Sequence, residues 1–321
     1  MRLDSFLVEK YPEHSRSVWR RYIEAGYVKV NGRVVARTEL AKDSDKIEID
    51  IPESTKQPLD LPVLYEDENV VVIDKPAGVL THSKGALNDE FTVADFIRTK
   101  SVGTDSREAR EDGERGSDES CDDRHEERSR EFRSEDFTGN RFGIVHRLDR
   151  ATSGVIIGAK TDEARKFLQK QFAERKAKKT YLAIVENPPL KPAARIDLPI
   201  ARDPKRPSRF RVDPKGKPAI TDYRVLQILR DGRALVELKP LTGRTHQLRV
   251  HMAHIGAPIV GDPIYGAAGT VPAKSGATGL QERFLQRKRE ERMLLHAACL
   301  EITIPGGERK TFRAELPKDF R

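Results

Sequence analysis

The first fifty residues combine two helical apolar patterns with patterns typical of strands. Leu3, Phe6 and Leu7 fall on one helical face. A second helical pattern, "SRSVWRRYIEAGYV", ends at Gly26, a residue type common just after a helix. "YVKVNGRVVA" then places apolar residues on both sides of an Asn-Gly pair, a strong β-hairpin signal, and "DKIEIDI" reads as a closing strand. These patterns predict a small N-terminal α/β domain over residues 1–51.

The rest of the chain is dominated by short β-branched runs. Residues 52–60 contain two prolines and few large apolar side chains, which is typical of a linker. Over residues 61–321, runs such as Val70–Asp74 and Val155–Gly158 predict buried strands. Helical patterns are few: "TDEARKFLQKQFAERKAKK" and "HQLRVHMAHIG". Many short strands with few helices predict an α+β domain around a mixed, largely antiparallel central sheet.

Two charged segments interrupt this pattern. Residues 101–140 hold 14 Asp or Glu, 7 Arg and only five apolar residues, so we expect a disordered acidic insertion. The whole chain carries +8 and this segment −7, so the other residues carry +15. The stretch 267–291 is also basic, and "LQERFLQRKREER" (residues 280–292) predicts a helix that either reaches along a polyanionic partner or is simply solvated.

The overall composition favours a polyanionic partner. The net charge is +8 and the isoelectric point about 9.4. No apolar run is long enough to span a membrane, and the N-terminus lacks the apolar core of a signal peptide. Cys121 and Cys299 match no disulfide or metal spacing. We expect a cytoplasmic monomer without a membrane partner.

The stretch "GIVHRLDRATSG" is the first candidate for chemistry. Gly143–Val145 reads as a strand end, and Val155–Gly158 reads as the next strand, so Arg147 and Asp149 are expected on the loop between them. Such loops commonly present catalytic side chains. An aspartate held near arginine stays ionised and can act as a nucleophile or base without a cofactor. The alternative is a solvated turn with a chance ion pair.

The residues indicate no cofactor or metal. The chain has no Walker-type or dinucleotide-binding glycine loop. His246, His251 and His254 lack both the spacing of a zinc-protease motif and a nearby carboxylate. In "LTGRTHQLRVH" we instead expect Arg244 and His246 to contact the phosphates or backbone of a nucleic acid.

The N-terminal pattern resembles a known RNA-binding domain. The segments "RLDSFL", "SRSVWRRYIEAGYVKVNGRVV" and "DKIEI" together resemble the domain first recognised in the small-subunit ribosomal protein S-four. The usual Gly-Asp before the last strand is replaced by Ser44-Asp45. The resemblance implies that the helix carrying Arg16 and Arg20 lies against structured RNA.

Four blocks of the larger domain resemble the RluA/RluC/RluD family of RNA pseudouridine synthases. "HRLDRATSG" fits the signature HRLDxxTSG at every fixed position. "KPAGVLTH", "KKTYLAIV" and "LTGRTHQLRVHMAHIGAPIVGD" match the other blocks in the right order. The resemblance implies the pseudouridine synthase fold, no cofactor, and isomerisation of uridine in structured RNA.

The resemblance also implies residue roles. Asp149 would be the catalytic aspartate, either attacking the ribose anomeric carbon or deprotonating the sugar after the base leaves. Tyr181 would stack on the uracil, Arg249 would pair with Asp149, and Arg147 would fill the space of the flipped nucleotide in the RNA. Arg244 is the competing partner for Asp149. From the residues alone, a core position is the favoured interpretation of Tyr181.

The expected substrate is large-subunit (23S) ribosomal RNA, with transfer RNA as the second choice. A non-catalytic RNA-binding ribosome-assembly factor would keep the fold without the reaction. A glycosidase using Asp149 would need a second carboxylate within about 5–10 Å. Asp162 and Glu163, on the next helix, are poor candidates for it.

Overall fold

A computed structural model gives the fold of most of the chain. It describes residues 1–11, 16–36, 39–51, 57–83, 90–101, 141–266 and 292–320. The expected acidic insertion (beyond Ser101), the expected helix up to residue 291 and part of the expected linker lie outside these ranges. The chain divides into two compact units, one of Met1–Asp60 with His82–Ile144 and one of Leu61–Thr81 with Val145–Arg321. In the described ranges, no helix has the length and apolar character needed to cross a membrane.

The first unit contains the helices and the hairpin that the N-terminal pattern predicts. Its elements are α1 (Leu3–Lys10), α2 (Arg16–Glu24), β1 (Val28–Val30), β2 (Arg33–Val34), β3 (Ile47–Ile49) and α3 (Val93–Ser101). The antiparallel sheet has the order β2-β1-β3. Asn31 and Gly32 both adopt positive φ (50° and 77°), as the expected two-residue hairpin turn requires. Leu3, Leu7 and Trp19 are buried in the core between the helices and the sheet.

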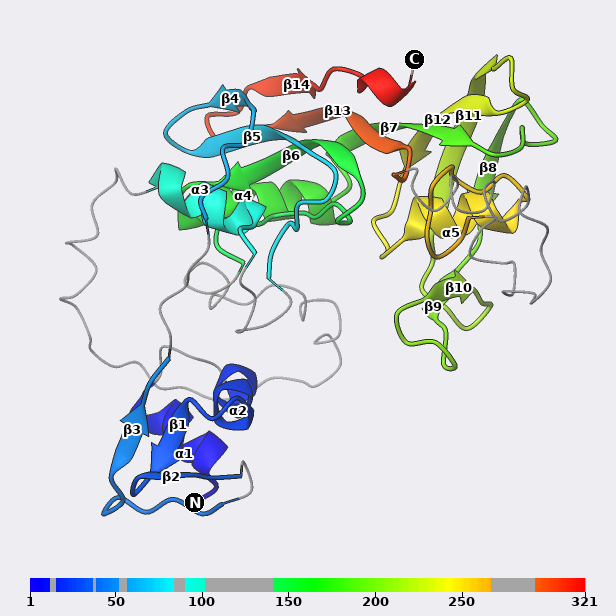
Figure 1. The fold of residues 1–321 in the computed structure, drawn as a ribbon. Coiled ribbons are helices and arrows are strands. Elements are labelled where there is room, and N and C mark those ends of the chain that lie inside the picture. Colours follow the sequence, from blue (N-terminus) through cyan, green and yellow to red (C-terminus); the bar gives the residue numbers. More distant parts are fainter. Residues whose placement is uncertain are drawn as a thin grey trace, which may run out of the picture. The chain divides into compact units, whose positions relative to one another are not determined.

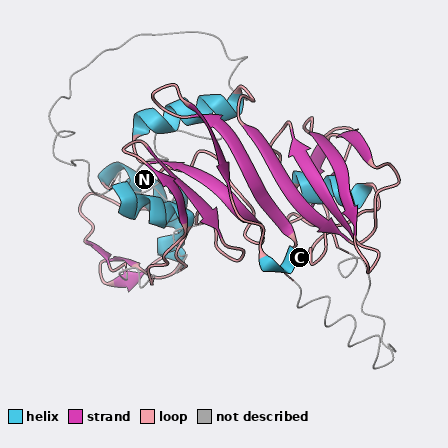
Figure 2. Cartoon of the chain, turned by 90° about the horizontal axis from the view of Figure 1, so that it is seen from above, coloured by secondary structure: helices cyan, strands magenta, loops and turns pink. Residues whose placement is uncertain are grey.

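The second unit is built on one nine-stranded sheet, shown in Figures 1 and 2. Its strands are β4 (Val63–Glu66), β5 (Val70–Lys75), β6 (Ser153–Ala159), β7 (Lys178–Val185), β8 (Ala193–Asp197), β11 (Ile220–Ile228), β12 (Ala234–Pro240), β13 (Leu295–Thr303) and β14 (Arg309–Arg313). The order is β4-β5-β6-β13-β7-β12-β11-β8, with β14 also paired to β13. The β6–β13 pairing is parallel and the other pairings in this sheet are antiparallel, which confirms the predicted α+β fold class.

Two helices pack against this sheet. Helix α4 (Asp162–Ala173) begins at Thr161, whose side chain accepts a hydrogen bond from the Ala164 amide, and it contacts β6 and β13. Helix α5 (Gln247–His254) contacts β12 and the small β9–β10 hairpin (Ile200–Arg202 and Phe210–Val212). A short 3-10 helix, Lys318–Phe320, follows β14. The α4 and α5 helices pack on two apolar clusters, one at each end of the sheet.

The loop before β6 differs from its predicted form. Residues 141–143 form a turn and Ile144 makes only a lone bridge, so the strand end predicted over Gly143–Val145 is wrong. Gly143 has a φ of 65°, which an extended strand does not allow, although all three residues are buried. At the other end of the loop, a Cβ on Gly154 would lie 2.3 Å from the Ala297 carbonyl oxygen. The close approach of β6 to β13 therefore requires glycine at position 154.

Candidate active site

The loop that carries Asp149 is fixed by hydrogen bonds on both sides of the aspartate. The Thr81 hydroxyl donates to the Leu148 carbonyl at 2.8 Å and accepts from the Leu148 amide at 3.2 Å. The Thr152 amide donates to the Asp149 carbonyl at 3.0 Å, which closes a tight turn. Leu148 is buried, whereas Arg147 is exposed and the Asp149 side chain is 19% exposed. The backbone is thus held while the two polar side chains remain accessible.

A buried lysine at the end of β5 supports the same loop. The Lys75 ammonium donates to the carbonyls of Pro76, Val79 and Arg150 at 2.9, 2.9 and 3.2 Å. Burial lowers the pKa of Lys75 to about 7, and the Asp149 carboxylate opposes part of that shift. Lys75 therefore ties the turn after β5 to the residue that follows Asp149.

Arg249, from α5, joins two carboxylates. Its Nη1 donates to Asp149 Oδ2 at 3.0 Å, while Nε and Nη2 bind the two oxygens of Asp262 at 2.7 and 2.8 Å. The Asp262 side chain is fully buried and accepts backbone N–H bonds from Ile264 and Tyr265. Burial alone would lower the pKa of Arg249, but the two carboxylates outweigh it and raise the pKa. A cationic guanidinium therefore stands beside Asp149, positioned mainly by Asp262.

His246 also approaches the aspartate. Its Nε2 is 3.8 Å from Asp149 Oδ2, and its Nδ1 is 3.0 Å from the Tyr265 hydroxyl. His246 has a φ of 57°, a left-handed conformation, directly before α5. Burial is the main cause that lowers the pKa of this imidazole, so the ring is neutral at pH 7. It contributes a polar ring edge beside Asp149 and no second positive charge.

Tyr181 lies at the centre of β7, paired with Leu238 of β12, and is partly buried against the apolar cluster near α5. Burial and the negative charge of Asp149 both raise the pKa of the Tyr181 phenol, so it stays protonated near neutral pH. The phenol and the Asp149 carboxylate are therefore electrostatic neighbours.

The other arginines predicted from the sequence to bind RNA, Arg244, Arg16 and Arg20, bind partners other than Asp149. Arg244 donates from Nε to the Pro218 carbonyl at 3.1 Å, so of the two arginines considered it is Arg249 that binds Asp149. In the N-terminal unit, Arg16 and Arg20 both bind the buried carboxylate of Asp4, with Nε distances of 3.0 and 2.7 Å. Their guanidinium groups thus have a structural partner.

The histidines considered as metal ligands have other contacts. His251 is buried, with Nδ1 3.0 Å from the Thr221 hydroxyl and Nε2 2.9 Å from the Leu198 carbonyl oxygen. Across the part of the chain that the structure describes, no group of three or more His, Cys, Asp or Glu side chains is placed to hold a metal.

Sequence reasoning did not single out three residues of this site: Lys75, Asp262 and Tyr265. Lys75 and Asp262 stand within motif blocks, "KPAGVLTH" and "GAPIVGD", but nothing local in those strings shows which group each side chain meets. Tyr265 follows three positions after Asp262, and its ring lies 5.1 Å from the Arg249 guanidinium carbon. A polar residue embedded in an apolar stretch was the available signal for Asp262.

Comparisons with known proteins give the family of the chain. The RNA pseudouridylate synthase family model matches residues 69–254, and the S4 domain model matches residues 1–39. Ribosomal large subunit pseudouridine synthase D of Xanthomonas campestris is 34% identical over 100% of this chain and 87% of its own length. Its Escherichia coli K12 counterpart is 32% identical over 99% and 88%. The structure of human RNA pseudouridylate synthase domain containing 1 matches with a TM-score of 0.54 and 25% identity, covering 83% of this chain and 87% of that one. The chain therefore belongs to the RNA pseudouridylate synthase family and is an enzyme of that class.

Proposed function

We propose that this enzyme isomerises a specific uridine of large-subunit ribosomal RNA to pseudouridine, with Asp149 as the catalytic residue. The observation that carries the assignment is the Asp149 carboxylate. It is partly exposed, on a fixed loop, and 3.0 Å from a buried arginine that a second carboxylate positions. The rRNA substrate is supported by the similarity to the two bacterial synthases, whose names give the large ribosomal subunit.

The reaction exchanges one glycosidic bond for another. The bond from ribose carbon one to uracil nitrogen one breaks, the base turns, and a carbon–carbon bond forms to uracil carbon five. Carbon five then loses its proton and nitrogen one gains one, so no cofactor or redox step is needed. Asp149 acts at the sugar, either by bonding the anomeric carbon or by removing a sugar proton after the base leaves. Arg249 holds the carboxylate in place in both routes through its 3.0 Å hydrogen bond to Oδ2.

Two further side chains act on the nucleotide. The target uridine has to leave its stack to reach Asp149, which costs about a few kcal/mol. In this proposal Arg147, which is exposed beside Asp149, fills the vacated space because its planar guanidinium stacks on bases. Tyr181 supplies an aromatic face for the uracil, and its protonated phenol adds no negative charge beside Asp149.

Basic groups outside this centre bind the RNA backbone in the same proposal. Arg2, Arg16 and Arg20 surround the single carboxylate of Asp4, which leaves a positive surplus at partly exposed side chains. Arg244 lies just before α5 and contacts the RNA nearer to the target uridine, and the neutral His246, which belongs to the centre itself, contacts the same part of the RNA. Their role is to position the RNA, which requires no base-specific contact.

The experiment uses two substrates, large-subunit rRNA and transfer RNA transcripts, each with tritium at carbon five of uracil. We expect the protein to release tritium from the rRNA and not from the transfer RNA. Release from transfer RNA alone would overturn the substrate assignment. Binding of rRNA without release, from both free rRNA and assembled large subunits, would instead support a non-catalytic RNA-binding factor.

A further inference from the structure

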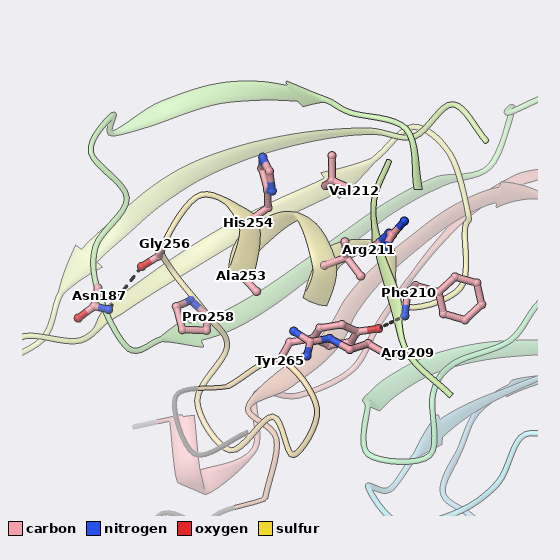
Figure 3. A pocket seen from close by; sticks show the side chains of 11 residues that line it. Asn187, Arg209, Phe210, Arg211, Val212, Ala253, His254, Gly256, Pro258 and Tyr265 are labelled. Atoms are coloured by element: carbon pink, nitrogen blue, oxygen red, sulfur yellow. Dashed lines mark hydrogen bonds between the residues drawn. The ribbon is translucent and has the colours of Figure 1, made fainter. Parts of the chain in front are cut away.

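A pocket of about 420 Å³ lies between α5, strand β10 and the chain around Tyr265 (Figure 3). Val212, Val250, Ala253 and Pro258 give it an apolar lining, and Tyr265 adds an aromatic ring. A volume of this size lies within the range of small-ligand sites.

The polar groups of the pocket favour an anionic ligand. Arg209, Arg211 and His254 contribute to the lining, and none of the lining residues is acidic. Arg211 already binds Asp213 at 2.8 Å. Arg209, by contrast, has no carboxylate within ion-pair distance among the described residues, and its guanidinium lies 5.4 Å from the centre of the Tyr265 ring. An uncompensated guanidinium beside an aromatic ring suits a phosphate with a planar base next to it.

One side chain connects this pocket to the candidate active site. The Tyr265 hydroxyl accepts a hydrogen bond from the Phe210 amide at 2.8 Å and lies 3.0 Å from His246 Nδ1. The other ring nitrogen of His246 is 3.8 Å from Asp149. A single imidazole therefore separates the wall of the pocket from the carboxylate proposed to act on the target uridine.

We propose that this pocket binds one unpaired nucleotide of the RNA substrate, a near neighbour of the target uridine. Its base lies against the partly exposed apolar lining formed by Val212 and Ala253, above the buried ring of Tyr265, and its phosphate binds Arg209. The bound nucleotide holds the strand open beside the flipped uridine, so the pocket reads the RNA at a second position. This inference rests on the proposed function.

The test is a double-mutant cycle, in which one change in the RNA and one in the protein are made separately and together. The RNA is a synthetic hairpin copied from the rRNA segment that carries the modified uridine, with its neighbours replaced one at a time by abasic nucleotides. Wild type should lose about tenfold in kcat/KM at one neighbouring position, the usual effect of one lost stacking contact. Ala253→Phe, which fills the pocket, should show that loss with intact RNA and no further loss with the abasic RNA.

A second cycle keeps the test valid if Ala253→Phe does not fold, which circular dichroism would show. Arg209→Gln is combined with a methylphosphonate, which removes the phosphate charge, at the same nucleotide. The two changes together should lower kcat/KM by no more than either change alone. Arg230→Gln removes an exposed arginine outside the pocket and should leave the rate and both RNA effects unchanged.

The outcomes separate this inference from the proposed function. Tritium release by wild type with simply additive RNA and protein effects in both cycles would overturn the pocket assignment alone. No release by wild type from intact rRNA would overturn the proposed function, and the pocket assignment with it.

Discussion

Replacing Asp262 by asparagine removes the buried charge that positions Arg249, while side-chain size is almost unchanged. The two charge-assisted hydrogen bonds, at 2.7 and 2.8 Å, join side chains that are 5% and 0% exposed. Breaking a buried pair in this way costs about 3–5 kcal/mol, because one charge stays buried without its partner. Asparagine keeps one acceptor oxygen, so we expect the free energy of unfolding to fall by about 3 kcal/mol, at the lower end of that range.

The same substitution should also slow the reaction. Without the Asp262 charge, Arg249 keeps one charged partner, the Asp149 carboxylate, and its guanidinium is free to move toward it. A displacement of this kind near reacting groups can lower the rate about 100-fold. The rate is followed as single-turnover tritium release.

Stability is best followed by urea unfolding with circular dichroism, which reports the large sheet. The single tryptophan, Trp19, lies in the N-terminal unit, so its fluorescence should be unchanged by this substitution.

A matched control is available at the protein surface. Asp222 also binds an arginine through two hydrogen bonds, to Arg195 at 2.7 and 2.9 Å, but the side chains are 38% and 58% exposed. Asp222→Asn should lower the free energy of unfolding by at most about 1 kcal/mol and leave the rate of tritium release unchanged, because solvent screens exposed ion pairs. If Asp262→Asn cost no more than Asp222→Asn, or kept the wild-type rate, the assignment of Asp262 as the residue that positions Arg249 would be refuted.

Three further changes test the frame around the site and the N-terminal unit. Burial acts to raise the pKa of Asp4, but the surrounding arginines hold it well below its ordinary 3.8, so the carboxylate stabilises the folded N-terminal unit above that pH. The stability advantage of wild type over Asp4→Asn should therefore shrink as the pH falls below about 3.8, as measured by Trp19 fluorescence during urea unfolding. Gly154→Ala should cost at least about 1–3 kcal/mol in unfolding followed by circular dichroism, because the new methyl group overlaps the Ala297 backbone. Lys75 has a pKa of about 7 in the folded protein against an ordinary 10.5, so unfolding takes up a proton between these pH values. Between pH 7 and 10.5 the stability of wild type should rise relative to Lys75→Met, and parallel pH profiles would contradict the burial of a titrating ammonium.

The predictions that succeeded rest on local chemistry. The Asn31-Gly32 turn and the end of α2 before Gly26 follow from residues that tolerate positive φ, and such residues act within a few positions of the chain. The large sheet follows from many short β-branched runs, because β-branched side chains favour extended backbone and each buried strand has to pair its N–H and C=O groups with a neighbouring strand. In each of these cases the physical cause lies within the segment itself.

The features that were missed or wrongly predicted depend on distant parts of the chain. Gly143–Val145 is buried and apolar like a strand, but it folds as a turn joined to a lone bridge. The Asp262–Arg249 pair forms only when the segment after α5 folds back against that helix. Lys75 finds one of its three acceptors 75 positions further along the chain, at Arg150. Spacing within a motif cannot reveal such pairings, because tertiary packing decides them.

The central claim is that Asp149 performs the chemistry, and one comparison tests it most directly. Wild type, Asp149→Asn and the control Asp222→Asn are each mixed in excess with rRNA that carries tritium at carbon five of uracil, and both RNA binding and tritium release are measured. We expect all three proteins to bind the RNA, and only wild type and Asp222→Asn to release tritium. Release by Asp149→Asn at the wild-type rate would contradict the account.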